Sequence, residues 1–296
     1  MNRSLIHLLL LALFCLAVPA PLSAVDKGII LTEDVQVHLG DSFMAEAEYY
    51  RAITEYKKFL ILFPASEQAD SVLFKIGMAY FRGDEFETAA AVFASVGEKY
   101  RESRYAPTAG YYAGLCFWRL NRLDEAAAAF SAVATRYPAS GDAPRALLEK
   151  SLVEFDQRNM AGSREELERF LATYPQDDRA AGARDALALL DRDRELPRKS
   201  PMVAGILCAL VPGAGHLYAG HPGDGITSLF LNGLFIAGTV VAVQQENYAV
   251  AGVVGVIGLP FYIGNIYGAA NAATKWNLSV RKELRGKIAV TLDAPF

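Results

Sequence analysis

Few residues in this sequence have the types and spacing that catalysis or metal binding would need. His216 and His221 stand on either side of a glycine turn, and Asp224 follows three residues after the second histidine. A protein metal site usually takes three or four such ligands, and two histidines on one helix face lie four residues apart rather than five. We therefore expect these side chains to be polar groups at a membrane interface, with no metal site and no cofactor.

The common signatures of catalysis are missing from the sequence as well. No glycine-rich loop runs into Lys-Ser or Lys-Thr, as a phosphate-binding loop would, and no serine stands in the strand–turn–helix context of a hydrolase nucleophile. Glu246 stands in a short polar stretch, so we expect it to lie in a loop. Inside a membrane-spanning segment, a carboxylate would instead indicate that the protein handles ions. The sequence therefore predicts a protein that is not an enzyme and has no catalytic residues.

Composition narrows the kinds of partner. Residues 25–199 carry 23 basic and 29 acidic side chains, and this mildly acidic balance argues against nucleic acid. Cys116 and Cys208 stand far apart in the chain and lack the neighbouring histidines or cysteines of a zinc site. We expect both cysteines to be small buried hydrophobic residues.

The most informative pattern is a repeat of aromatic residues. Phe63, Tyr100, Tyr137 and Tyr174 are spaced by 37 residues, and proline directly follows three of them. A fixed period of this length is typical of stacked repeat proteins, in which each unit buries its apolar face against its neighbours. Proline disfavours a helical conformation in the residue before it, so a helix should end at each aromatic residue. Such architectures usually bind other proteins.

The same register holds upstream of each aromatic residue. Apolar residues recur seven and fourteen positions earlier, which places them on one face of a helix, and small residues form a further column where two helices can approach. The columns are Tyr56, Phe93, Phe130, Leu167; Tyr49, Phe86, Leu123, Met160; and Gly40, Gly77, Gly114, Ser151. We expect an all-α solenoid over residues 25–191, with hairpins at about 30–64, 65–101, 102–138 and 139–175 and a capping helix at 177–191.

These residues resemble a tetratricopeptide repeat. Gly77–Tyr80 matches the glycine-to-aromatic spacing of the first helix, and Ala89–Phe93 matches the second helix. The unit is longer than the family's 34 residues. With Phe or Tyr before Pro at its joint, it is similar to the periplasmic branch that includes the Tol-Pal coordinator protein and the lipoprotein of the outer-membrane assembly machine. The fourth unit departs most, at Ser151 and Glu154.

The inner side of such a stack predicts the binding residues. The first helix of each unit tends to line the concave surface. Positions of that helix outside the apolar register form two series. The first series is Lys75, Tyr112 and Glu149, and the second is Arg82, Arg119 and Asp156. Tyrosine and arginine are frequent in binding hot spots. We predict that Lys75, Arg82, Tyr112 and Arg119 contact a protein partner, with solvated or inter-repeat contacts as the alternative.

The N-terminus predicts export. Residues 1–24 combine a basic start, an apolar run and a small-residue end, which is the pattern of a secretory signal peptide cleaved before Val25. An uncleaved anchor is the alternative. A lipoprotein site at Cys15 fits poorly, because this cysteine stands in the middle of the apolar run.

The C-terminal block predicts a membrane domain. After a charged linker at 192–200, residues 201–274 carry only two charges. The block contains three apolar segments, which are Met202–Ala219, Ile226–Val243 and Ala249–Ala273. The second and third are long enough to cross a bilayer as helices, whereas a Pro-Gly turn interrupts the first. A soluble all-α core is the alternative.

The basic tail, residues 275–296, bears on topology. A cleaved signal places the repeats outside the cytoplasm, whereas the positive-inside tendency retains the tail inside. External repeats and a cytoplasmic tail require an odd number of crossings, so three crossings are our first choice. Two crossings with an external tail are the second choice. Alternating apolar character at Lys287–Leu292 also predicts one short strand.

The first apolar segment contains a recognisable motif. Its residues Pro212, Gly213, Gly215, Tyr218 and Gly220 form the pattern Pro-Gly-x-Gly-x-x-Tyr-x-Gly. This resembles the turn that joins the helices of small TM2-like membrane domains, although His216 stands where a glutamine is expected. The resemblance implies anchoring and assembly rather than catalysis.

The third apolar segment predicts a helix-packing surface. Small residues at Gly264, Gly268 and Ala272 fall on one helix stripe, and Asn265 and Asn271 can form hydrogen bonds across an interface. Packing inside the block is the preferred reading, and a homo-oligomer through the membrane domain is the alternative. Together these patterns predict a scaffold in the bacterial inner membrane whose periplasmic repeats bind other envelope proteins. The alternative function is a regulatory or accessory subunit of a membrane transporter or channel.

Overall fold

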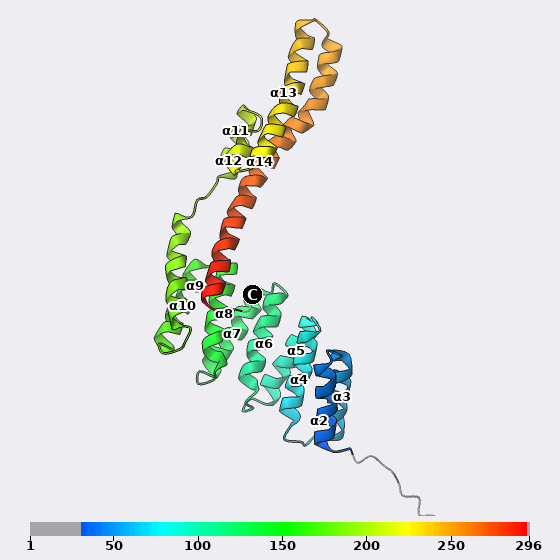
Figure 1. The fold of residues 1–296 in the computed structure, drawn as a ribbon, viewed down its shortest axis with the longest axis vertical. Coiled ribbons are helices and arrows are strands. Elements are labelled where there is room, and N and C mark those ends of the chain that lie inside the picture. Colours follow the sequence, from blue (N-terminus) through cyan, green and yellow to red (C-terminus); the bar gives the residue numbers. More distant parts are fainter. Residues whose placement is uncertain (1–30, 295–296) are drawn as a thin grey trace, which may run out of the picture. The chain divides into compact units, whose positions relative to one another are not determined.

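The computed structural model describes residues 31–294, except for the side chains of residues 194 and 195. The predicted signal peptide, residues 1–24, lies outside the described residues. Within 31–294 every regular element is a helix, which confirms the expected all-α class (Figure 1). The strand predicted at Lys287–Leu292 is wrong: these residues belong to the end of a long helix, where Leu284, Ile288 and Leu292 are buried at a helical spacing of four.

The chain divides into two compact units, residues 1–66 and 67–296. Within its described residues, 31–66, the first unit contains one hairpin of helices, α2 (Glu33–Ala45) and α3 (Tyr49–Leu62). A Cβ atom on Gly40 would lie 2.3 Å from the ring of Tyr56. Only glycine therefore lets the two helices pack at this distance, as its place in the small-residue column predicted.

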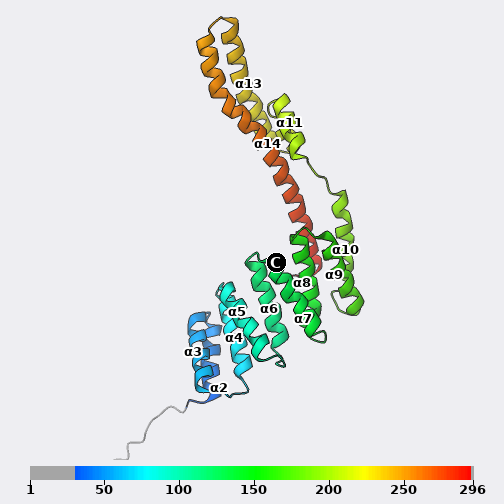
Figure 2. The same ribbon diagram turned by 180° about the vertical axis from the view of Figure 1, so that it is seen from behind.

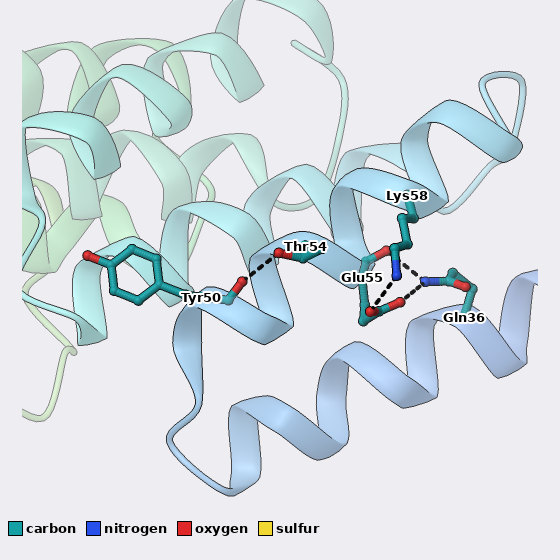
Figure 3. A network of polar contacts seen from close by, with 5 residues as sticks. All are labelled: Gln36, Tyr50, Thr54, Glu55 and Lys58. Carbon is teal, nitrogen blue, oxygen red and sulfur yellow. Dashed lines mark hydrogen bonds and ion pairs between the residues drawn. The ribbon is translucent and has the colours of Figure 1, made fainter.

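A polar network also joins these two helices (Figure 3). The buried Gln36 amide donates hydrogen bonds to the main-chain oxygen and a carboxylate oxygen of Glu55, at 2.9 and 2.8 Å. Lys58 binds the other carboxylate oxygen at 2.8 Å, and the Thr54 hydroxyl donates to the Tyr50 carbonyl. The hydrogen bond from Lys58 is the main reason that the pKa of Glu55 lies below its usual value.

The second unit begins with three further hairpins and a single helix that follows them, and it also contains the C-terminal block. Their bounds are α4 (Ala69–Arg82), α5 (Phe86–Lys99), α6 (Ala106–Arg119), α7 (Leu123–Arg136), α8 (Asp142–Asp156), α9 (Met160–Thr173) and α10 (Ala180–Asp191). Successive helices pack on one another from α4 to α10. The predicted 37-residue period is therefore a structural period of hairpins.

Glycine and aromatic residues fix the distance between the helices of each hairpin. A Cβ atom on Gly77 would lie 2.5 Å from the Phe93 ring, and one on Gly114 would lie 2.6 Å from the Phe130 ring. In the fourth unit Ser151 is fully buried and Leu167 takes the place of the aromatic residue. The smaller Leu167 side chain makes room for the larger Ser151, so this hairpin keeps a packed core.

The repeating aromatic residues end the second helix of each unit. Tyr100, Tyr137 and Tyr174 are all helix C-caps, with φ near −127°. The Tyr137 hydroxyl donates to the Arg101 carbonyl at 3.3 Å, and the Tyr174 hydroxyl donates to the Pro138 carbonyl at 2.8 Å. The aromatic residue therefore ends its own helix and also ties one unit to the preceding joint.

The C-terminal block begins with two short helices, α11 (Pro201–Leu210) and α12 (Ala214–Ala219), followed by α13 (Pro222–Gln244) and α14 (Tyr248–Thr291). By length and composition, α13 and α14 are candidate membrane spans. The first apolar segment contains no such helix, because α11 has ten residues and covers about 15 Å, half of a hydrocarbon core. The number of membrane crossings stays a prediction.

The helix α14 is 44 residues long and has two different halves. Its first part packs along α13 and carries many exposed apolar residues. Its second part contains the basic tail and packs on α10 and α8, so both views show its end beside the repeat helices (Figures 1 and 2). The predicted basic tail is therefore a docked helix, continuous with the apolar hairpin.

Candidate functional site

An aromatic cluster joins the helices of the second and third hairpins. The Tyr112 ring on α6 stacks on Phe93, with centroids 5.6 Å apart, and meets Phe81 edge-on at 5.1 Å. Phe74 on α4 stacks on Tyr105 at 5.3 Å. Tyr112 is half-buried in this cluster, so it packs two hairpins together as well as facing outward.

The three predicted cationic residues lie on α4 and α6, the helices that carry Phe74, Phe81 and Tyr112. Arg82 and Arg119 are exposed at the C-terminal ends of α4 and α6, and Lys75 is half-buried on α4. The Arg119 guanidinium lies 5.7 Å from the centroid of the Phe86 ring. The predicted binding residues therefore lie on the first helices of neighbouring hairpins, as expected.

The corresponding place in the fourth hairpin is occupied by α14. Arg285 of α14 binds Asp156 of α8, with Nε 3.2 Å from Oδ1, and its guanidinium lies 5.2 Å from the Trp118 ring centroid. The Trp118 indole N–H also donates to Asp156, at 3.0 Å. Arg281 donates to the Phe155 carbonyl and stacks on the Phe155 ring at 4.9 Å.

An apolar seat supports these polar contacts. Leu284, Ile288, Ala289 and Leu292 of α14 belong to the same buried cluster as the apolar residues of α8 and α10. Gly182 on α10 permits the closest approach, since a Cβ atom there would lie 1.9 Å from the Thr291 carbonyl oxygen. The end of α14 is therefore part of the repeat core.

Asp156 and Arg119 occupy the same register position, and so do Glu149 and Tyr112. These positions are basic or aromatic in the second and third units and acidic in the fourth unit, on which the basic end of α14 packs. Within residues 31–294, the acidic positions of the fourth hairpin therefore have the charge opposite to that of the helix that lies over them.

Glu149 lies beneath this contact. It is 4% exposed, and the Tyr111 hydroxyl donates to its Oε1 at 3.2 Å. Burial raises the pKa of Glu149 to about 7, although the Tyr111 hydrogen bond and the charges of Arg145 and Arg285 favour the ionised form. Its Oε2 has no hydrogen-bond partner among the described residues.

The glycine motif builds the turn between α11 and α13. Gly213 and Gly220 have φ of 86° and 87°, which side chains rarely adopt, and both flank α12. A Cβ atom on Gly215 would lie 1.9 Å from the Ala204 carbonyl oxygen. The Tyr218 hydroxyl accepts a hydrogen bond from the Ser200 N–H at 2.9 Å. These residues, with Pro212 in the turn before α12, therefore fold the first apolar segment back on itself.

The small-residue stripe of α14 faces several surroundings. Asn265 is buried and its Oδ1 accepts from the Cys208 thiol at 3.6 Å, and a Cβ atom on Gly268 would lie 3.2 Å from His216. A Cβ atom on Gly264 would meet nothing within 4 Å, and Asn271 is exposed. The stripe therefore packs partly inside the block.

A hollow of about 530 Å³ lies between α12, α13 and α14 and is lined by His216, Asn232 and Asn265. Each of these buried side chains has one polar atom without a hydrogen-bond partner among the described residues. Within residues 31–294 no group of three or more His, Cys, Asp or Glu could hold a metal ion.

Sequence reasoning missed the residues that seat α14. Trp118, Asp156, Arg281 and Arg285 were placed in different predicted domains, because their contacts join positions up to 129 residues apart. One signal was available: the acidic residues Glu149 and Asp156 interrupt two otherwise basic or aromatic series.

A tetratricopeptide repeat family model matches residues 74–141 and 113–178. The region from 74 to 178 therefore carries tetratricopeptide repeats, which confirms the resemblance at family level for this part of the chain. No curated protein matches the sequence. A repeat region of this kind is a protein-interaction scaffold, and such modules are generally non-catalytic.

Three solved structures match the chain at low sequence identity. A tetratricopeptide repeat protein from Parabacteroides merdae has 15% identity and a TM-score of 0.46, over 86% of this chain and 98% of that one. The apo form of RapI has 10% identity and a TM-score of 0.47, over 77% and 63%. The pilF protein of Pseudomonas aeruginosa has 16% identity and a TM-score of 0.41, over 80% and 95%. Similarity at this level says nothing about partners.

Proposed function

We propose that this protein is a membrane-anchored scaffold whose repeat region binds other proteins through the inner helices of its hairpins. The observation that carries the proposal is the continuity of α14, which joins an exposed apolar hairpin to the core of the repeats. Because the anchor packs into the core of the repeats, a partner bound to the repeats would be held at the membrane surface.

The exposed residues of the apolar hairpin support membrane insertion. Phe230, Leu234, Val256 and Tyr267 are each more than half exposed, and side chains of this kind would contact lipid rather than water. Asp224 and Glu246 stand at the two ends of α13, which leaves the span between them without charge. The hairpin therefore fits a bilayer in composition as well as in length.

The docked end of α14 supports two crossings. The repeats and residues 281–292 lie in one core, so they occupy the same side of any membrane. The chain must then cross an even number of times, and α13 and α14 supply the two crossings. The turn at residues 245–247 lies on the opposite side.

We place this protein in a bacterial inner membrane, with the repeats and the docked tail in the periplasm. The signal-peptide pattern of residues 1–24 supports this side. Lysine and arginine are in excess on the repeat side of the apolar hairpin, which by the positive-inside tendency would favour a cytoplasmic location for the repeats. Large domains, however, are translocated largely regardless of charge. The signal therefore takes precedence.

The chemistry of the partner follows from the inner face. α14 places basic residues over Asp156 in the fourth hairpin, whereas Arg82 and Arg119 hold the same register position in the second and third. The reversed charge favours an acidic amphipathic helix of another envelope protein, which would lay apolar residues on the Tyr112 cluster.

Photo-crosslinking in cells tests this function. A photoreactive residue at position 119 of the full chain should capture a partner, and the captured peptide should map to an acidic helix. The same residue at Arg136, exposed on α7, is the matched control and should not capture it. The double change Arg82→Glu and Arg119→Glu should abolish capture from position 112. Equal capture from 119 and 136 would contradict the assigned face.

A further inference from the structure

A small hollow lies where the repeats meet the membrane block. Its volume is about 290 Å³, and its lining includes Arg158, Asp193, Arg198, Asn277 and Arg281. These residues come from the turn between α8 and α9, the linker after α10, and the middle of α14. The hollow is separate from the inner-face residues proposed to bind a protein partner.

The wall of the hollow is tied together by hydrogen bonds. The Asn277 side chain accepts from the Lys199 N–H at 2.9 Å and donates to the Lys199 carbonyl at 2.8 Å. This pair of bonds fixes the linker against α14 across 78 residues of sequence. These hydrogen bonds therefore hold the linker, which carries Arg198, against α14, which carries Arg281.

The described lining of the hollow is unbalanced in charge. It contains three guanidinium groups and one carboxylate, and Arg198 already binds that carboxylate on Asp193 at 2.9 Å. Burial lowers the pKa of Arg281, and the like charges of Arg158 and Arg198 also lower it, whereas the carboxylates of Asp193 and Asp156 act in the opposite direction. Arg158 and Arg281 both line the hollow, so an anion bound between them would offset two like charges.

The position of the hollow matches the level of lipid headgroups. Pro201, where the first apolar helix begins, and Thr274, where the apolar part of α14 ends, both line it. Trp276 follows Thr274 by two residues, and the Lys199 amine lies 3.5 Å from the centroid of the Trp276 ring. Tryptophan and lysine are typical of the membrane–water interface.

We propose that this hollow binds the phosphate group of an anionic phospholipid, with Arg158 and Arg281 as its principal ligands. Guanidinium groups match phosphate oxygens in pairs of parallel hydrogen bonds, and the half-buried position of Arg281 strengthens its attraction for an anion. The inference rests on the proposed membrane anchoring, because only that places a lipid headgroup at this depth. A soluble phosphate has the same binding chemistry and is separated by the experiment.

Native mass spectrometry of the full chain in detergent tests the site. Phosphatidylglycerol and phosphatidylcholine are titrated separately, and inorganic phosphate and glycerol 3-phosphate are added as soluble competitors. The wild type should retain one phosphatidylglycerol in preference to phosphatidylcholine. Arg158→Gln and Arg281→Gln should each weaken this binding by about tenfold or more, the usual effect of losing a charge-assisted hydrogen bond.

Lys282→Gln is the matched control, since Lys282 is exposed beside Arg281 on the same helix and outside the lining. It should leave binding unchanged, and an equal loss in this variant would overturn the site in favour of diffuse charge. Arg281→Gln also loses the hydrogen bond to the Phe155 carbonyl and could unfold for that reason. Arg158→Gln keeps that bond, so its lipid binding is the deciding result in that case. Soluble phosphate binding as tightly as the lipid would overturn the lipid as ligand.

Carbonate extraction of cell membranes separates this inference from the proposed function. If the wild type is released by carbonate, membrane anchoring fails and the lipid site fails with it. If the wild type stays in the membrane and lipid retention does not depend on Arg158 or Arg281, the lipid site alone is wrong.

Discussion

The third and fourth hairpins share one sequence register and differ in what their inner helices carry. α6 has Tyr112 and Arg119 at the positions where α8 has Glu149 and Asp156. In the fourth hairpin these acids lie beneath the basic end of α14, and Asp156 binds Arg285 directly. The period therefore sets where residues lie in the solenoid, whereas the charge at these two positions of the fourth hairpin matches the basic helix that lies over them.

The comparison predicts first that the fourth hairpin depends on α14 for stability. Ile288 is 1% exposed in the core shared with α8 and α10. Ile288→Ala should lower the free energy of unfolding by about 3 kcal/mol, because it removes buried methyl groups and leaves a cavity. Chemical denaturation of the full chain in detergent measures this. Val290→Ala, at a position 82% exposed, is the control and should change stability by less than about 0.5 kcal/mol.

The second prediction converts the third hairpin toward the fourth. Gly114→Ser should cost about 2 kcal/mol of unfolding free energy, because the new side chain meets the Phe130 ring. Adding Phe130→Leu should recover part of that loss, since the fourth hairpin carries the pair Ser151 and Leu167. A double-mutant cycle measures the coupling, and strict additivity would contradict the proposed exchange of volume.

A control for this pair is available within the same unit. A Cβ atom on Gly97 of α5 would meet nothing within 4 Å. Gly97→Ala should therefore leave stability unchanged or raise it by up to about 1 kcal/mol, as expected for alanine in a helix.

The third prediction concerns pH and applies to the fourth hairpin alone. The folded pKa of Glu149 is raised to about 7, so the folded state holds its proton more tightly than the unfolded state. The stabilising effect of this proton is complete below the ordinary glutamate pKa and is lost as pH rises through 7. We expect a loss of about 1 to 2 kcal/mol in unfolding free energy between pH 5 and 8.

Glu149→Gln isolates this contribution. The variant should lose that part of the pH dependence, measured by denaturation at both pH values. An unchanged pH profile in the variant would show that Glu149 is not the titrating group.

The smallest expected effect on stability belongs to the exposed inner face of the third hairpin. Arg119→Asp, which copies the fourth hairpin, should change the unfolding free energy by roughly 0.5 kcal/mol or less because Arg119 is exposed. It should nevertheless reduce capture of an acidic partner from position 112. A large loss of stability would show that Arg119 serves the fold and not binding.

The sequence predicted the repeats well for a physical reason. Columns such as Gly77 with Phe93 are local contacts that recur at a fixed period, so each copy supports the next. The docking of α14 could not be predicted in the same way, because Arg285 and Asp156 form a single contact 129 residues apart. Arg281 and Arg285 were interpreted from composition alone as charges flanking a membrane span.

The C-terminal end shows how periodicity can mislead over a short window. Apolar residues alternate over Lys287–Leu292, which favours a strand when those six residues are considered alone. With Leu284 included, the buried residues fall four apart on one helix face. The length of the pattern and not its composition decides between the two structures.

Fusion of a compartment-sensitive reporter at three positions tests the central claim that the chain leaves the repeats, crosses the membrane twice and returns to them. We expect reporters at residue 195 and after Phe296 to be active on the same, periplasmic side, and one inserted at Glu246 to be active on the other side. Reporters at 195 and 296 on opposite sides of the membrane would contradict it.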